Sequence, residues 1–127
     1  MKYNNIEIQI SFNIDESNKH IEEDFQTIMQ YGIDNIIKEN LIPWITATDF
    51  KDMDKNRIFE GLKLFKIEYY YGKIIDKYSP TGKTDYFGQF DFCFESCSEY
   101  TDDILEAVAM QVIVLNNEIV QINEYDI

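Results

Sequence analysis

The chain opens with a strict alternation of apolar and polar side chains. Every second residue from Ile6 to Ile14 is apolar, and the residues between them are Glu7, Gln9, Ser11 and Asn13. Successive side chains of a β-strand point to opposite faces, so this period of two indicates a strand with one face in a core. We therefore predict a half-buried strand over residues 5–14.

The hydrophobic period then changes to that of an amphipathic helix. Apolar residues recur at helical spacing, namely at Ile21, Phe25, Ile28, Met29, Ile33, Ile36 and Ile37. This pattern predicts a long helix over about 19–39. Gly32 weakens its middle by about 1 kcal/mol relative to alanine, and Pro43 is expected to end any continuation.

The second half of the chain reads as short strands joined by turns. Strands are predicted over 62–71, 74–78, 86–95, 110–115 and 119–124, with turns at 72–73, 79–83 and 116–117. In the strand over 62–71, four aromatic or aliphatic side chains share one face: Phe65, Ile67, Tyr69 and Tyr71. In the strand over 86–95, three phenylalanines face inward, while the outward side chains are Gln89, Asp91, Cys93 and Glu95.

Three short helical pieces complete this prediction. One covers Asp49 to Met53 behind a Thr48 cap, and one includes Ile58 and Phe59. A third begins near Ser98 or Thr101 and runs through Ala109. The expected fold is a single α+β domain over residues 1–127, with a mainly antiparallel sheet of about five to six strands and the 19–39 helix packed on one face.

Charge narrows the choice of partner. The chain carries 24 acidic and 11 basic side chains, a net charge of −13. The last 44 residues hold ten acids and no lysine or arginine. Nucleic acid and anionic membranes need a basic footprint, so this charge disfavours both. It favours a basic protein partner, or it serves solubility alone.

Other composition features indicate the setting. The sequence has no apolar run long enough for a membrane span and no signal-peptide pattern, which predicts a cytoplasmic protein. Isoleucine, asparagine and lysine are frequent, as in an AT-rich, bacterial genome.

No catalytic, cofactor or metal motif emerges from the sequence. Gly82-Lys83-Thr84 ends like a phosphate-binding loop, but Lys77 stands where that loop needs glycine. His20 is the only histidine, and with Cys93 and Cys97 it gives three candidate ligands where a structural zinc site needs about four. We therefore predict no catalytic residue, no cofactor and no metal. The sequence leaves the state of the two thiols open, because a strand would hold them too far apart for a disulfide and a turn between them could change this.

The leading functional hypothesis is a small acidic binding protein of the immunity type, which neutralises a basic toxin, such as a nuclease, by covering its active site. Unpaired carboxylates attract a cationic partner and accelerate encounter. The predicted contact residues are Asp91, Glu95, Glu99, Tyr100, Asp102, Asp103 and Glu106.

Two alternatives remain open at this point. One is a small enzyme or small-molecule binder, with a pocket between helix and sheet lined by Trp44 and tyrosines. A buried carboxylate in a deep pocket favours it, and a filled core counts against it. The other is a non-catalytic subunit or homodimer formed by edge-strand pairing. The sequence leaves the oligomeric state open.

Overall fold

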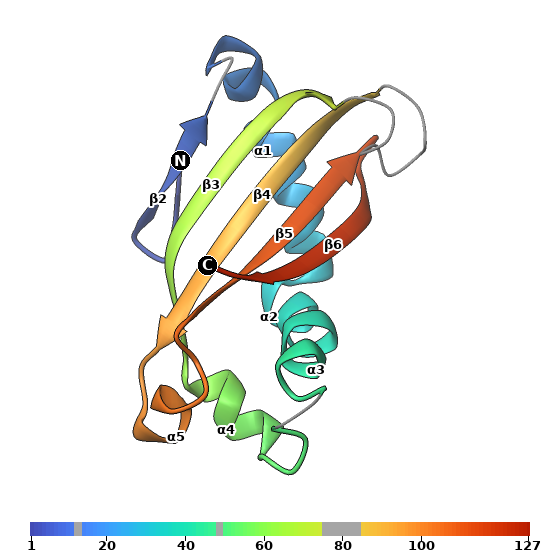
Figure 1. Ribbon diagram of the computed structural model, residues 1–127. Coiled ribbons are helices and arrows are strands. Elements are labelled where there is room, and N and C mark those ends of the chain that lie inside the picture. The colour runs from blue at the N-terminus through green and yellow to red at the C-terminus, as the bar shows by residue number, and fades with distance from the viewer. Residues whose placement is uncertain (12–13, 48–49, 75–84) are drawn as a thin grey trace.

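Six strands form one sheet in a computed structural model that describes residues 1–11, 14–47, 50–74 and 85–127. They follow chain order across the sheet, as β1 (Lys2–Tyr3), β2 (Ile6–Ser11), β3 (Leu62–Ile74), β4 (Asp85–Ser96), β5 (Ala107–Leu115) and β6 (Glu118–Asp126). β2 and β3 run parallel, and the other neighbouring pairs are antiparallel. The predicted α+β fold with a mainly antiparallel sheet is therefore confirmed (Figure 1).

The helices lie on one face of the sheet and at one of its ends. They are α1 (Ile14–Tyr31), α2 (Ile33–Ile36), a π-helical turn η1 (Ile37–Leu41), α3 (Ile42–Ile45), α4 (Lys55–Glu60) and α5 (Glu99–Asp102). Figure 1 shows α1 crossing behind the sheet, with α4 and α5 side by side below it. The face turned toward the viewer carries no described helix, and we call it the open face.

The long helix has different bounds from those predicted. It begins at Ile14, five residues before the expected start, and ends at Tyr31. Gly32 takes a φ of 98°, a left-handed value that breaks the helix rather than weakening it. The chain then stays helical as far as Ile45 and passes through Pro43, contrary to expectation. Pro43 lies in the first turn of α3, where a proline is tolerated.

The core lies between α1 and the inner face of the sheet. Ile21, Phe25 and Ile28 of α1 are buried there. The sheet contributes a layer of aliphatic and aromatic side chains, including Ile8, Ile67, Tyr69, Phe90, Phe92, Phe94, Met110, Val112 and Val114. The three phenylalanines of β4 face inward as predicted, because alternate side chains of a strand share a face.

β3 corrects two details of the prediction. A bulge between Leu64 and Lys66 removes Phe65 from the inner face, and Phe65 is 39% exposed. An extra residue in one strand changes which side chains face inward beyond it. The turn expected at Gly72-Lys73 is also wrong, because these residues continue β3 and pair with Phe87 and Tyr86.

Of the short helices predicted after the long helix, one is found as expected and another has different bounds. α4 contains Ile58 and Phe59, and Asp54 caps it by accepting hydrogen bonds from the amides of Asn56 (2.9 Å) and Arg57 (3.3 Å). The helix expected to run through Ala109 is wrong, since α5 ends at Asp102 and β5 already begins at Ala107.

The Asn116-Asn117 hairpin turn is confirmed, with φ values of 51° and 64°. A second asparagine pair, Asn4-Asn5, turns β1 into β2 in the same way, with φ values of 49° and 66°. Five predictions fall at least in part outside the described residues: the strand over 5–14, the Thr48 cap, the helical piece over 49–53, the strand over 74–78 and the turn over 79–83. Of the helical piece, residues 50–53 are described, and they form a turn instead of a helix.

Candidate functional site

Six of the seven predicted contact residues lie at one end of the molecule. Glu95 is at the end of β4, and α5 with the segment after it carries the other five. We call residues 50–63 and 95–106 the α5 end; α4 and the loop before it lie beside α5 there (Figure 1). Asp91 stands apart, four residues along β4 from Glu95, which is about 13 Å on an extended strand.

A cluster of hydroxyl groups holds α5 in place. The buried Thr101 Oγ1 lies 2.6 Å from Ser96 Oγ and 3.1 Å from Ser98 Oγ, and it donates to the Gly61 carbonyl at 3.3 Å. A Cβ at Gly61 would lie 2.5 Å from the Thr101 side chain, so only glycine permits this approach. The cluster fixes the backbone of α5 from inside and leaves the neighbouring carboxylates at the surface.

Tyr100 ties α5 to α4. The Arg57 guanidinium lies over its ring at 3.8 Å from the centroid. Its hydroxyl accepts a hydrogen bond of 2.8 Å from the amide of Asp54, the residue that caps α4. One face of the Tyr100 ring is thus already covered within the protein, which makes Tyr100 a supporting residue as well as a predicted contact.

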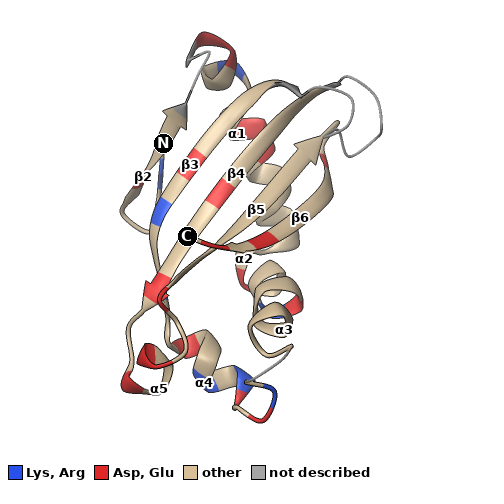
Figure 2. Ribbon diagram, viewed as in Figure 1, with Lys and Arg blue, Asp and Glu red and all other residues tan. Residues whose placement is uncertain are grey.

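The carboxylates of the α5 end are largely without cationic partners. Glu95 lies 3.9 Å from Lys63, and Asp102 accepts a hydrogen bond of 2.7 Å from Ser96 Oγ. Among the described residues, no lysine or arginine lies within ion-pair distance of Glu99, Asp103 or Glu106. The α5 end holds eight acidic and four basic side chains. Figure 2 shows basic positions on α4 and in the loop before it, and Lys63 lies at the start of β3.

Asp91 lies in the middle of the open face, in a different environment. Its Oδ2 accepts a long hydrogen bond of 3.4 Å from Gln89, while its Oδ1 is buried and has no partner among the described residues. Burial raises the pKa of Asp91 above that of a free carboxyl group. Cross-strand register places Glu68 on one side of it and Gln111 on the other.

This polar row continues across the open face. Asn123 of β6 donates to Gln111 at 3.0 Å and accepts from Gln121 at 3.1 Å. On β3, Lys66 and Glu68 form an ion pair of 2.9 Å. In Figure 2, acidic positions stand on the adjacent strands β3 and β4. The row is mostly amide and carboxylate, with its cation paired internally.

The open face also buries apolar side chains. Phe87, Cys93, Ala109 and Ile113 are at most 5% exposed and lie outside the main core cluster. Burial raises the pKa of Tyr125, which pairs with Ala109, to about 12. Cys93 and Cys97 are both free thiols, the first buried and the second exposed.

Between helix α1 and the sheet, the buried carboxylate is Asp24. This carboxylate is only 9% exposed, and it accepts a hydrogen bond of 2.5 Å from the Tyr69 hydroxyl. A Cβ at Gly88 would collide with Asp24 Oδ2, so the backbone of β4 approaches this carboxylate closely. Burial raises the pKa of Asp24. The Tyr69 hydroxyl and the backbone of β4 lie directly against this carboxylate, and the sequence did not reveal this buried contact.

His20 lies near this pair on α1, with its ring against β3. Its ring stacks on Tyr71 with centroids 3.9 Å apart and planes inclined by 16°. The His20 side chain is half-buried. Among the described residues, no group of three or more Asp, Glu, His or Cys side chains is arranged to hold a metal ion.

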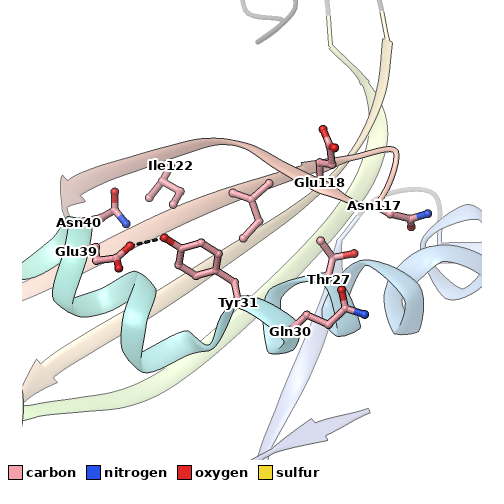
Figure 3. Close-up of a pocket in the computed structure, with 9 residues that line it drawn as sticks. Thr27, Gln30, Tyr31, Glu39, Asn40, Asn117, Glu118 and Ile122 are labelled. Carbon is pink, nitrogen blue, oxygen red and sulfur yellow. Dashed lines mark hydrogen bonds between the residues drawn. The ribbon is translucent and has the colours of Figure 1, made fainter.

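A groove at the other edge of the sheet was also missed by the sequence. It has a volume of about 730 Å³ and lies between α1 and η1 on one side and β6 with its preceding turn on the other. Figure 3 shows Tyr31 in the middle of the groove, with Glu39 and Asn40 at one end and Glu118 toward the other. These residues are spread over three elements, so no local sequence pattern marks them.

The chain matches no known protein-family model, no curated protein and no solved structure. In the part of the chain that the structure describes, no helix is long and apolar enough to cross a membrane.

Proposed function

We propose that this protein is a small acidic inhibitor of the immunity type, which binds a basic toxin through the α5 end. The supporting observation is the set of exposed carboxylates there, Glu99, Asp103 and Glu106, with no described cation in ion-pair range. The set lies around a short helix that internal hydroxyl contacts hold in place. A fixed array of unpaired charge loses little freedom when a partner binds.

The chemistry of the partner follows from the sign of this charge. A nuclease must hold phosphates, so its active site is basic. An acidic protein of this charge is steered toward such a site, and encounter is accelerated by about 10 to 1,000-fold at low ionic strength. Covering that site blocks the substrate without any chemistry by the inhibitor.

The test is a binding measurement with charge reversals. The triple variant Glu99→Lys, Asp103→Lys, Glu106→Lys leaves Asp102 in place, because Asp102 accepts the hydrogen bond from Ser96. Its partner would first be captured with the wild-type protein at low salt and identified among the products of neighbouring genes. We expect the triple variant to weaken binding at least about 100-fold, because it replaces three attractive charges with repulsive ones, and to flatten its salt dependence.

The matched control carries three reversals elsewhere: Glu7→Lys, Asp15→Lys and Glu22→Lys. These exposed residues lie on β2 and α1, away from α5, and change the net charge equally. Loss of binding in both variants would indicate a non-specific charge effect. Unchanged affinity and salt slope in the α5-end variant would refute the proposal.

A further inference from the structure

The groove beside β6 is the second place where the described chain concentrates acidic and amide groups around an aromatic ring. Ile119 and Ile122 line it on the strand side. Tyr31, which is 50% exposed, lines the helix side, and its hydroxyl donates a short hydrogen bond to Glu39 (Figure 3). The bond holds the Glu39 carboxylate at the rim of the groove and raises the pKa of Tyr31.

β6 is an edge strand with one side unpaired. Its described partner is β5, and it ends the sheet. The amide of Ile127 donates to the carbonyl of Ala107 at 3.1 Å. Since paired and unpaired residues alternate in an antiparallel ladder, the amides and carbonyls of Ile122, Glu124 and Asp126 point to the free edge. These groups are available to another extended chain.

This edge carries only part of the usual protection against pairing. Natural edge strands are protected by shortness, proline, charged side chains or a bulge. β6 has nine residues and neither lysine nor proline, but it carries Glu118, Glu124 and Asp126, and its register with β5 shifts between Ile113 and Val114. Its charges repel an acidic strand and leave the edge open to a basic one, and an open edge beside a groove is the arrangement in which a protein captures an extended peptide by adding it to a sheet.

We propose that an extended basic segment of a partner protein adds to the free edge of β6 and places alternate side chains in the groove. On the added strand, the side chains that face the same way as Ile119 and Ile122 would enter the groove. The aliphatic stem of a lysine or arginine would lie against Tyr31 and Ile122 while its charge reaches Glu39. Glu118 gives a second carboxylate toward the other end.

Charge selects a basic segment and disfavours a second copy of this chain. β6 itself carries Glu118, Glu124 and Asp126 and no basic residue. Self-pairing along this edge would bring these carboxylates opposite one another, and like charges placed opposite each other across strands are destabilising. The groove residues include no lysine or arginine either.

This inference goes beyond the proposed function, because it assigns a different surface and a different mode of recognition. A partner can use either surface without the other. The residues to be varied for the groove are distinct from those of the α5 end, so the two proposals fail separately.

The test uses synthetic ten-residue peptides in which lysine alternates with valine, labelled for fluorescence anisotropy. We expect the alternating basic peptide to bind and the matching glutamate–valine peptide not to bind. Glu39→Gln with Glu118→Gln should weaken binding about tenfold, because the double variant removes two charge-assisted interactions. Failure of the basic peptide to bind would overturn the proposal.

A second pair of variants separates strand addition from simple charge attraction. Glu124→Pro removes an edge amide without removing a hydrogen bond to β5, since the Glu124 amide faces outward. Glu124→Gln is its matched control, because it removes the same charge and keeps the amide. We expect Glu124→Pro to bind at least about fivefold more weakly than Glu124→Gln. Both variants would be checked for an unchanged circular dichroism spectrum, and Asp126→Pro with Asp126→Gln would replace them if Glu124→Pro did not fold.

Equal affinity of the proline and glutamine variants would show that charge alone attracts the peptide, which would overturn strand addition. The α5-end triple variant should bind the peptide with affinity within about twofold of the wild type. If that variant instead abolished peptide binding, the groove would not be the site, although the proposed function would still stand.

Discussion

At the scale of single residues, Asp91 is the side chain whose environment most opposes its charge. The folded protein leaves Oδ1 buried without a described partner and raises the pKa of the carboxyl group. The ionised form is therefore less favourable in the folded state than in the unfolded chain. Its contribution to stability is lost as pH rises through the folded-state pKa and recovered as pH falls below it.

Asp91→Asn should consequently raise the free energy of unfolding at about pH 7 and lose this advantage toward about pH 4, because the raised pKa leaves wild-type Asp91 already protonated in the folded state at that pH. Urea unfolding at both pH values measures the difference. Asp103→Asn, at an exposed carboxylate, is the control. A wild type more stable than Asp91→Asn at the higher pH would contradict the assigned environment.

The sequence predicts where these residues point better than how deeply they lie. Alternation along β4 correctly turns Asp91 outward and Phe90 inward. Burial of Asp91 depends on neighbours such as Gln111, which lie on other strands. The Asp24–Tyr69 contact likewise joins residues 45 positions apart and needs Gly88 on a third element. Hydrophobic periodicity and local propensity contain no information about contacts between residues so far apart in the sequence.

At the scale of elements, the β5–β6 hairpin depends on two asparagines with left-handed backbone angles. Asn116 and Asn117 have φ values of 51° and 64°. Glycine adopts this region freely, and a β-branched residue does not. Asn117→Val should lower the free energy of unfolding by about 1–2 kcal/mol, whereas Asn117→Gly should keep or slightly increase it. Thermal unfolding of both variants checks this, and equal destabilisation would indicate that the asparagine side chain itself makes a stabilising contact.

The start and end of each element could be predicted only where adjacent residues determine them. The asparagine pair predicts a hairpin because the turn chemistry is contained in two adjacent residues. The sequence pattern places helix α1 too late because Ile14 also completes the alternation of β2, so one residue satisfies both periods. The bulge at Leu64 and Lys66 depends on how β3 pairs with β4, which β3 alone does not specify. The groove combines three elements and lies beyond any single pattern.

At the scale of the whole molecule, the net charge of −13 means that acidic side chains repel one another in the folded protein. This repulsion lowers the stability of the compact state. Salt screens this repulsion, because the Debye length falls from about 30 Å at 0.01 M to about 8 Å at 0.15 M. We expect sodium chloride over that range to raise the midpoint of thermal unfolding by several degrees. Peptide or toxin binding should weaken over the same range, so salt acts on stability and on binding with opposite signs.

The α5-end triple variant provides the comparison. Each acid-to-lysine reversal adds two positive charges, so three of them bring the net charge from −13 to about −7. The repulsion that salt can screen is then smaller, and the rise in the unfolding midpoint should be smaller as well. Calorimetry of both proteins at low and moderate salt measures it. A larger salt-dependent rise in the variant would contradict charge repulsion as the cause.

The parallel pairing of β2 with β3 has a consequence for the order of folding. Ile8 pairs with Ile67, so nearly half of the chain must be spanned before this contact forms. Contacts of high sequence separation carry a loop-closure cost and form slowly. Strands β4 to β6, by comparison, pair with neighbours close in sequence. The first two strands should therefore dock last during folding and detach first during local unfolding. Proteases and chaperones would then act mainly on the amino-terminal strands, because these are the most often exposed.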